Sequence, residues 1–161
     1  MPVLTTERCR MDSLRESDIP YTLPLLTNEE VRRYLGGAVS ENTAAEKLTA
    51  WAAAKEDVYF TVRLIEDNTF IGLISLSPHY DKTKTELSYQ FLPDFWGKGY
   101  AFEALSAVLD YCKSSLEMKE VVSETQSINF RSCRLLEKLG YQLTEQFFRF
   151  GVNQNLYTKT L

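Results

Sequence analysis

The chain has 161 residues, of which 44% are hydrophobic and 25% are charged. This composition is typical of a folded globular protein, and the length suits one domain, which we expect to span residues 1–161. The 18 basic and 22 acidic residues give a net charge of −4, which argues against nucleic acid as a partner. We expect no membrane partner, because no apolar run approaches the roughly 18 residues of a membrane helix and the N-terminus does not resemble a signal segment.

The sequence holds three cysteines and one histidine, which restricts its chemistry. Cys9, Cys112 and Cys133 are odd in number and far apart, so they predict neither a disulfide framework nor a zinc cluster. A cytoplasmic location fits best, and Cys112 and Cys133 fall at helical positions where burial is expected rather than nucleophilic attack. Because His79 is the single histidine, a multi-histidine metal site is excluded and we expect no metal. Its place beside Pro78 predicts that His79 is a surface residue in a loop.

The first third of the chain predicts one strand followed by three helices. Ser17, Asn28 and Ser40 are helix N-cap candidates, and Gly36 with Gly37 should end the second helix. Pro24 should end or kink the first helix. The expected elements are a strand at Arg8–Leu14 and helices at Ser17–Leu26, Asn28–Leu35 and Ser40–Lys55.

The rest of the chain alternates between strand and helix patterns. Thr85–Phe91 is the clearest strand, with Leu87, Tyr89 and Phe91 on one face and polar side chains on the other. The other expected elements are a hairpin of Val58–Val62 and Phe70–Ile74, a helix from Gly99 through Cys112, a strand at Val121–Thr125, a helix at Asn129–Leu139, and a closing hairpin of Tyr141–Phe150 and Leu156–Leu161. This order predicts an α+β fold with a mixed, largely antiparallel sheet flanked by helices on both faces.

A turn with two glycines joins the clearest strand to the longest helix. Small residues let a ligand approach the backbone, and amides at a helix N-terminus favour an anion, so the turn predicts a phosphate cradle. A tight turn without a ligand is the alternative. The segment Phe95–Ala101 matches neither a P-loop nor a dinucleotide fingerprint, which disfavours a nucleotide-phosphate binder.

Residues Glu86–Leu105 resemble the acetyl-coenzyme A binding segment of the GNAT superfamily of N-acetyltransferases. The pattern of Gln or Arg, then x-x-Gly-x-Gly or Ala, falls on residues 96–101, where Gly99 and Ala101 match and Trp96 departs from Gln or Arg. Residues 129–141 resemble the N-x-x-S-x-R-x-L-E-K-x-G-F/Y helix of the RimJ/RimL-like branch, in which tryptophan is common at the place of Trp96. Thr6–Arg8 and Glu30–Gly37 also resemble that branch, so the resemblance covers nearly the whole chain.

The resemblance implies acetyl-coenzyme A as cosubstrate. The strands around residues 87–91 and 121–125 would diverge to admit the pantetheine arm, to which Asn129 would hydrogen bond; helix capping is the alternative role of Asn129. Backbone amides from Lys98 to Ala101 would hold the pyrophosphate. The expected cosubstrate-binding residues are Phe91, Trp96, Gly97, Lys98, Gly99, Tyr100, Ala101 and Asn129.

The resemblance also suggests catalytic residues. Glu86 would be the base that deprotonates the acceptor amine, directly or through water, although a solvated strand residue is the alternative. A backbone amide near Phe91 would stabilise the oxyanion. Many relatives carry a tyrosine where this chain has Leu136, so Ser132 becomes the candidate for the leaving thiolate, with a helix first-turn hydroxyl as its alternative. The closing hairpin offers no carboxylate at residues 149–152, which leaves Glu145 as a reserve base.

These observations predict an acetyl-coenzyme A dependent N-acetyltransferase that acts by direct acyl transfer. The acceptor would be a small amine or a protein N-terminus. Residues 29–34 and the Gly36–Gly37 loop resemble the family's variable substrate-facing helices. The alternative is a noncatalytic acyl-coenzyme A binding module on the same fold. The free edge of the closing hairpin makes a homodimer possible.

Overall fold

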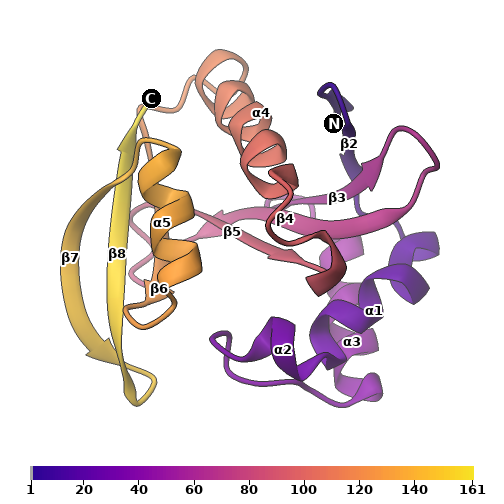
Figure 1. Ribbon diagram of the computed structural model, residues 1–161, viewed down its shortest axis with the longest axis horizontal. Coiled ribbons are helices and arrows are strands. Elements are labelled where there is room, and N and C mark those ends of the chain that lie inside the picture. The colour runs from indigo at the N-terminus through magenta and orange to yellow at the C-terminus, as the bar shows by residue number, and fades with distance from the viewer. Residues whose placement is uncertain (1) are drawn as a thin grey trace.

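The computed structural model describes residues 2–161, which form a single mixed α+β domain around one sheet (Figure 1). Over this range the sheet has eight strands in the order β1-β2-β3-β4-β5-β6-β8-β7. Neighbouring strands are antiparallel except β5 and β6, which are parallel. The strands are β1 (Leu4–Thr5), β2 (Cys9–Ser13), β3 (Val58–Leu64), β4 (Phe70–Pro78), β5 (Thr85–Phe91), β6 (Glu120–Gln126), β7 (Gln142–Arg149) and β8 (Val152–Thr160).

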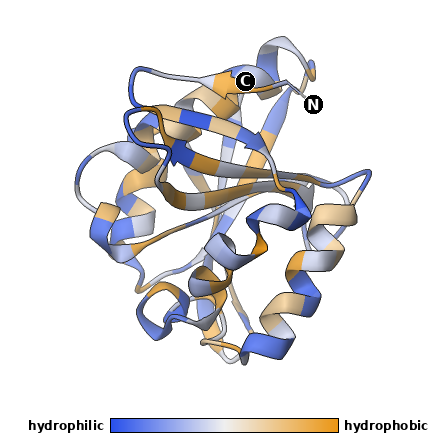
Figure 2. Cartoon of the chain, turned by 90° about the vertical axis from the view of Figure 1, so that its right-hand side faces the viewer, coloured by the Kyte–Doolittle hydropathy of each residue, from blue (hydrophilic) through white to orange (hydrophobic). Residues whose placement is uncertain are grey.

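Helices cover both faces of the sheet, as the sequence predicted. The period-2 alternation of β4 divides its side chains between two cores: Ile74 lies in the core with α4 and α5, and Leu73 in the core with α1–α3. Figure 2 shows hydrophobic residues along the central strands and hydrophilic residues on the loops. The helices are α1 (Ile19–Thr27), α2 (Glu29–Arg32), α3 (Glu41–Ala53), α4 (Tyr100–Ser114) and α5 (Phe130–Lys138).

Two of the three predicted N-caps are confirmed. The side chain of Asn28 accepts a hydrogen bond from the Val31 amide, and that of Ser40 accepts one from the Thr43 amide. The prediction for Ser17 is wrong, because it lies inside a 3₁₀ turn at Glu16–Asp18 that precedes α1.

Two other element ends differ from the predictions, one because of a local turn and one because of long-range strand pairing. Helix α2 ends at Arg32 rather than Leu35, because the Arg32 carbonyl accepts bonds from the amides of Leu35 and Gly37 and the chain turns there. Strand β8 begins at Val152 rather than Leu156, because its first residues pair with β7 and, from Gln154 onward, with β6 as well.

Candidate active site

The parallel strands β5 and β6 separate soon after they meet. In the described chain they share one register pair, Glu86 with Val122, and the Ser123 hydroxyl then donates to the Leu87 carbonyl at 2.8 Å. Beyond this point, the edge of β5 that faces β6 has no partner strand within residues 2–161. The backbone N–H and C=O groups along that edge are therefore open to a ligand. The sheet therefore opens beside the C-terminal half of β5, as the resemblance implied.

A pocket lies in this opening and brings together several expected cosubstrate-binding residues. The buried Oε1 atom of Gln90 has no hydrogen-bond partner within residues 2–161. An amide of a pantetheine arm would satisfy it, because a buried polar atom normally has a partner. The pocket therefore fits such an arm. Its lining residues are Val31, Leu35, Tyr89, Gln90, Phe91, Trp96, Ala101, Asn129, Arg131, Ser132 and Leu135.

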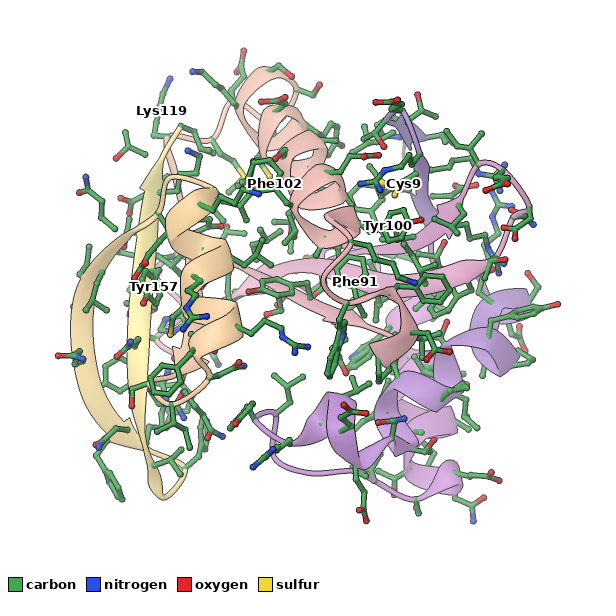
Figure 3. The ribbon with its side chains drawn as sticks, viewed as in Figure 1. Cys9, Phe91, Tyr100, Phe102, Lys119 and Tyr157 are labelled. Carbon is green, nitrogen blue, oxygen red and sulfur yellow. The ribbon has the colours of Figure 1, made fainter. Side chains whose placement is uncertain are left out.

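The glycine turn leads from the end of β5 into α4. Gly97 and Gly99 have φ of 71° and 82°, a left-handed conformation that side chains with a Cβ rarely adopt. The turn places the free amides at the start of the 15-residue helix α4, where the helix dipole favours an anion. Figure 3 shows Phe91 and Tyr100 at the junction of β5 with this helix. The turn thus has the local geometry of a phosphate cradle.

Two arginines add positive charge near the turn and the pocket. Arg8 donates to the Lys98 carbonyl at 3.0 Å, pairs with Glu103 at 2.8 Å, and so fixes the turn from β2. Arg131 lies 4.3 Å over the Trp96 ring beside the pocket. Sequence reasoning did not assign either residue to the site, although both lie inside the segments that carry the family resemblance.

Ser132 and Tyr89 form a hydroxyl pair in the pocket. Asn129 caps α5 by accepting a bond from the Ser132 amide, and the Ser132 Oγ lies 2.5 Å from the Tyr89 hydroxyl. Burial raises the pKa of Tyr89, so the phenol stays protonated at neutral pH. The sequence pattern indicates only that Tyr89 lies on the apolar face of β5, because its partner on α5 is 43 residues away.

A second cleft, of about 560 Å³, adjoins the first pocket at Leu35, which lines both. Glu86 lies half-buried in this cleft, and its carboxylate accepts a bond from the Glu124 amide at 3.2 Å. Burial raises the pKa of Glu86, while the charges of His79 and Arg149 lower it by a smaller amount. The lining residues are Tyr34, Leu35, Gly36, Tyr80, Glu86, Ser88, Glu124, Thr125, Gln126, Arg149, Phe150 and Gln154.

The prediction of His79 as a surface residue is wrong. It is 3% exposed, and its Nε2 lies 2.8 Å from the Glu124 carboxylate. Arg149 contacts the same carboxylate and has its Nη2 3.3 Å from His79 Nε2. Ligand atoms of His79, Glu86 and Glu124 lie within 4.8 Å of one another, a spacing that suits a cation. Because the guanidinium of Arg149 is already bonded to Glu124, the chain supplies that cation itself.

The cysteines and Glu145, the reserve base, lie outside the two pockets. Cys112 and Cys133 are buried, as expected, and so is Cys9. Glu145 lies on an exposed stretch of β7 and is not among the residues that line either pocket. Among residues 2–161, no helix has the length and apolar character needed to cross a membrane.

Residues 8–142 match the family model described as an acetyltransferase (GNAT) domain, so the chain belongs to the GNAT acetyltransferase family. Acetyl-coenzyme A is the cosubstrate of this family. An uncharacterized N-acetyltransferase, YoaA, of Bacillus subtilis is 27% identical over 88% of this chain and 83% of its own length. FsC-acetyl coenzyme A-N(2)-transacetylase of Aspergillus fumigatus is also 27% identical, over 91% of this chain and 68% of its own length.

Solved structures share the fold. A GNAT family acetyltransferase from Bacillus anthracis superposes with a TM-score of 0.87 at 22% identity, covering 99% of this chain and 98% of that one. RimL, a ribosomal L7/L12 α-N-protein acetyltransferase solved with coenzyme A, has a TM-score of 0.82 at 13% identity, covering 99% and 98%. These similarities agree with the α+β fold predicted from the sequence.

Proposed function

We propose that the chain, acting as one domain over residues 1–161, transfers the acetyl group of acetyl-coenzyme A to a primary amine by direct attack in a ternary complex. The observation that carries this proposal is the meeting of two sites at Leu35. One is the pocket beside the glycine turn, and the other is a cleft that holds the Glu86 carboxylate. An amine in the cleft would then approach a thioester in the pocket.

Glu86 is the proposed base. A primary amine is protonated at neutral pH and attacks only when neutral, so a carboxylate must accept its proton directly or through one water. The raised pKa of Glu86 brings this carboxylate closer to the pH at which it works. The positive charge of Arg149 favours the ionised carboxylate, although by less than burial disfavours it.

The pocket residues would hold the cosubstrate and assist the departing sulfur. The amides of residues 98–101 would bind the pyrophosphate, and Gln90 and Asn129 would bind the amides of the arm. Acetyl-coenzyme A supplies an activated thioester. A backbone amide near Phe91 would stabilise the oxyanion. The Ser132–Tyr89 pair would donate a hydrogen bond to the leaving sulfur, for which a thiol pKa near ~8.5 demands only modest help.

We make narrower proposals about the family branch, the acceptor, the cellular location and the oligomeric state. RimL and the ribosomal-protein-S5-alanine acetyltransferase of Vibrio fischeri are fold neighbours at 13% and 14% identity, which supports a RimJ/RimL-like branch. We therefore propose a protein N-terminus or a small amine as the acceptor. Three buried thiols support a reducing cytoplasm. The free edge of β7 supports a homodimer.

An acceptor screen tests the function. Purified protein is mixed with acetyl-coenzyme A and, separately, with 2-phenylethylamine, spermidine, glycine and peptides that begin with alanine or serine. Thiol release and a mass increase of one acetyl group are expected with at least one amine. Saturable cosubstrate binding without turnover on any acceptor would instead support the noncatalytic module.

A further inference from the structure

His79 lies in the loop between β4 and β5 and contacts Glu124, a residue of the second cleft, in which we place the acceptor. Its Nε2 faces Glu124 at 2.8 Å, whereas its buried Nδ1 has no hydrogen-bond partner within residues 2–161 and lies 3.3 Å from the carboxylate of Asp81. The imidazole is buried, with 4% of its side chain exposed, whereas the Asp81 side chain is 49% exposed. The ring is therefore a buried link between a carboxylate in the cleft and one in water.

Acetyl transfer to an ammonium group produces a proton that must leave. The nitrogen loses two protons as the C–N bond forms and the C–S bond breaks. One proton ends on the coenzyme A sulfur, and the other is released to solvent. When acceptor and cosubstrate fill the two pockets, they cover the direct route from Glu86 to water, so a path through the protein becomes useful.

We propose that His79 and Asp81 form the exit path for this proton, an inference that rests on the proposed function. In the tautomer whose proton is on Nδ1, Nε2 accepts a hydrogen bond from Arg149 Nη2 and is free of a proton of its own. A proton from Glu86 then passes through one water to Nε2, while the ring releases its Nδ1 proton to Asp81 and on to water. His79 touches neither substrate, so it acts through Glu86. Imidazole suits this role because each of its nitrogens can accept or donate a proton.

The surrounding groups support a path rather than a closed ion pair. Glu86 and Glu124 offer ligand atoms within 4.8 Å of His79, a gap that one water can bridge. Arg149 contacts Glu124 and lies 3.3 Å from His79 Nε2, so it adds fixed positive charge on the cleft side. Asp81, the group on the outer side, is held in place by the Thr83 amide at 3.0 Å. Two backbone bonds fix the loop, because the His79 amide donates to the Lys84 carbonyl and the Lys82 amide donates to the His79 carbonyl.

The first test uses Asp81→Asn, with Asp67→Asn as a matched control. Each aspartate caps a turn by accepting the amide of the residue two positions later at 3.0 Å, but only Asp81 faces His79. With the best amine of the screen and dilute buffer, we expect Asp81→Asn to lower kcat about tenfold, less than the roughly 10²–10⁴-fold contributed by a group at the reacting nitrogen. Asp67→Asn should keep wild-type kcat. Equal kcat in both variants and the wild type would overturn the proposal.

The second test separates proton transfer from packing. His79→Ala is assayed with rising concentrations of imidazole and, separately, of pyrazole, which has a similar shape but is a far weaker base. We expect imidazole to restore kcat and pyrazole to leave it low, while calorimetry shows wild-type affinity for acetyl-coenzyme A. Rescue of kcat by both compounds, or by neither, would overturn the proposed exit path. A wild-type protein without turnover on any amine would overturn the proposed function, and the exit path with it.

Discussion

Glu86 is a carboxylate whose burial works against the stability of the fold. It lies half-buried on β5, and loss of water outweighs the favourable charges of His79 and Arg149, so its pKa is raised. A raised folded-state pKa stabilises the protein below the unfolded pKa of about 4.3, and this contribution is lost as the pH rises through the folded value. At neutral pH the ionised side chain therefore costs stability.

We predict that Glu86→Gln is more stable than the wild type at pH 7. The amide keeps an oxygen for the Glu124 amide without a buried charge. The measurement is the free energy of unfolding in urea at pH 4 and pH 7. The advantage of Glu86→Gln should grow between these pH values, whereas the exposed control Glu145→Gln should show no such trend. A Glu86→Gln variant that loses stability relative to the wild type as the pH rises would contradict the sign of the shift.

The face on which a residue lies was predictable where the local sequence pattern determines it. The alternation of β5 placed Glu86 on a polar face, and the structure has it there beside the opening of the sheet. His79 was not predictable, because its partners Glu124 and Arg149 lie 45 and 70 positions away. A histidine next to Pro78 has no local sign of burial, so only the assembled sheet shows its place.

At the scale of elements, α5 begins at a residue that serves two purposes. Asn129 caps the helix through the Ser132 amide and also lines the cosubstrate pocket. Ser40 caps α3 in the same way through the Thr43 amide but does not line that pocket. The two caps therefore offer a matched comparison.

We predict that Asn129→Ala and Ser40→Ala each cost about 1 kcal/mol of stability through the lost cap. Only Asn129→Ala should also weaken acetyl-coenzyme A binding, because it removes a polar group from the pocket. Urea unfolding and isothermal calorimetry of both variants check this. Equal affinities for acetyl-coenzyme A would leave Asn129 with a capping role alone.

Element positions were largely readable from the sequence, whereas only the ends fixed by local hydrogen bonds were. The caps at Asn28 and Ser40 are local hydrogen bonds, and the predictions for them hold. Strand β8 extends through polar residues 153–155 because β7 pairs with all three of them and β6 pairs with the last two. No single-chain pattern marks such a strand, since its partners rather than its own side chains define it.

Across the whole molecule, one hydrophobic core lies against each face of the sheet, and all three cysteines lie in the core that contains α4 and α5. Cys9 and Cys112 are fully buried, and burial raises the pKa of each thiol to about 11. Cys133 is 8% exposed in the same core. Cys9 and Cys112 therefore hold little thiolate at neutral pH in the folded protein.

We predict that the native thiols react slowly with 5,5′-dithiobis(2-nitrobenzoic acid) at pH 8. Unfolding in guanidinium chloride returns the thiol pKa to about 8.5 and exposes the sulfurs, so all three should then react quickly. The colour released per chain over time checks this. Rapid native reaction of Cys112 would show that the core opens more readily than its packing indicates.

Glu86 is the proposed base that deprotonates an amine next to the cosubstrate pocket. The most direct test of this role is the pH dependence of kcat/KM for one accepted amine, measured for the wild type and for Glu86→Gln. The wild type should lose rate at acid pH with an apparent pKa above the ordinary glutamate value of about 4.3. Glu86→Gln should lack that acid limb and be slower by roughly 10²–10⁴-fold at neutral pH. Superimposable profiles for the two proteins would contradict this role.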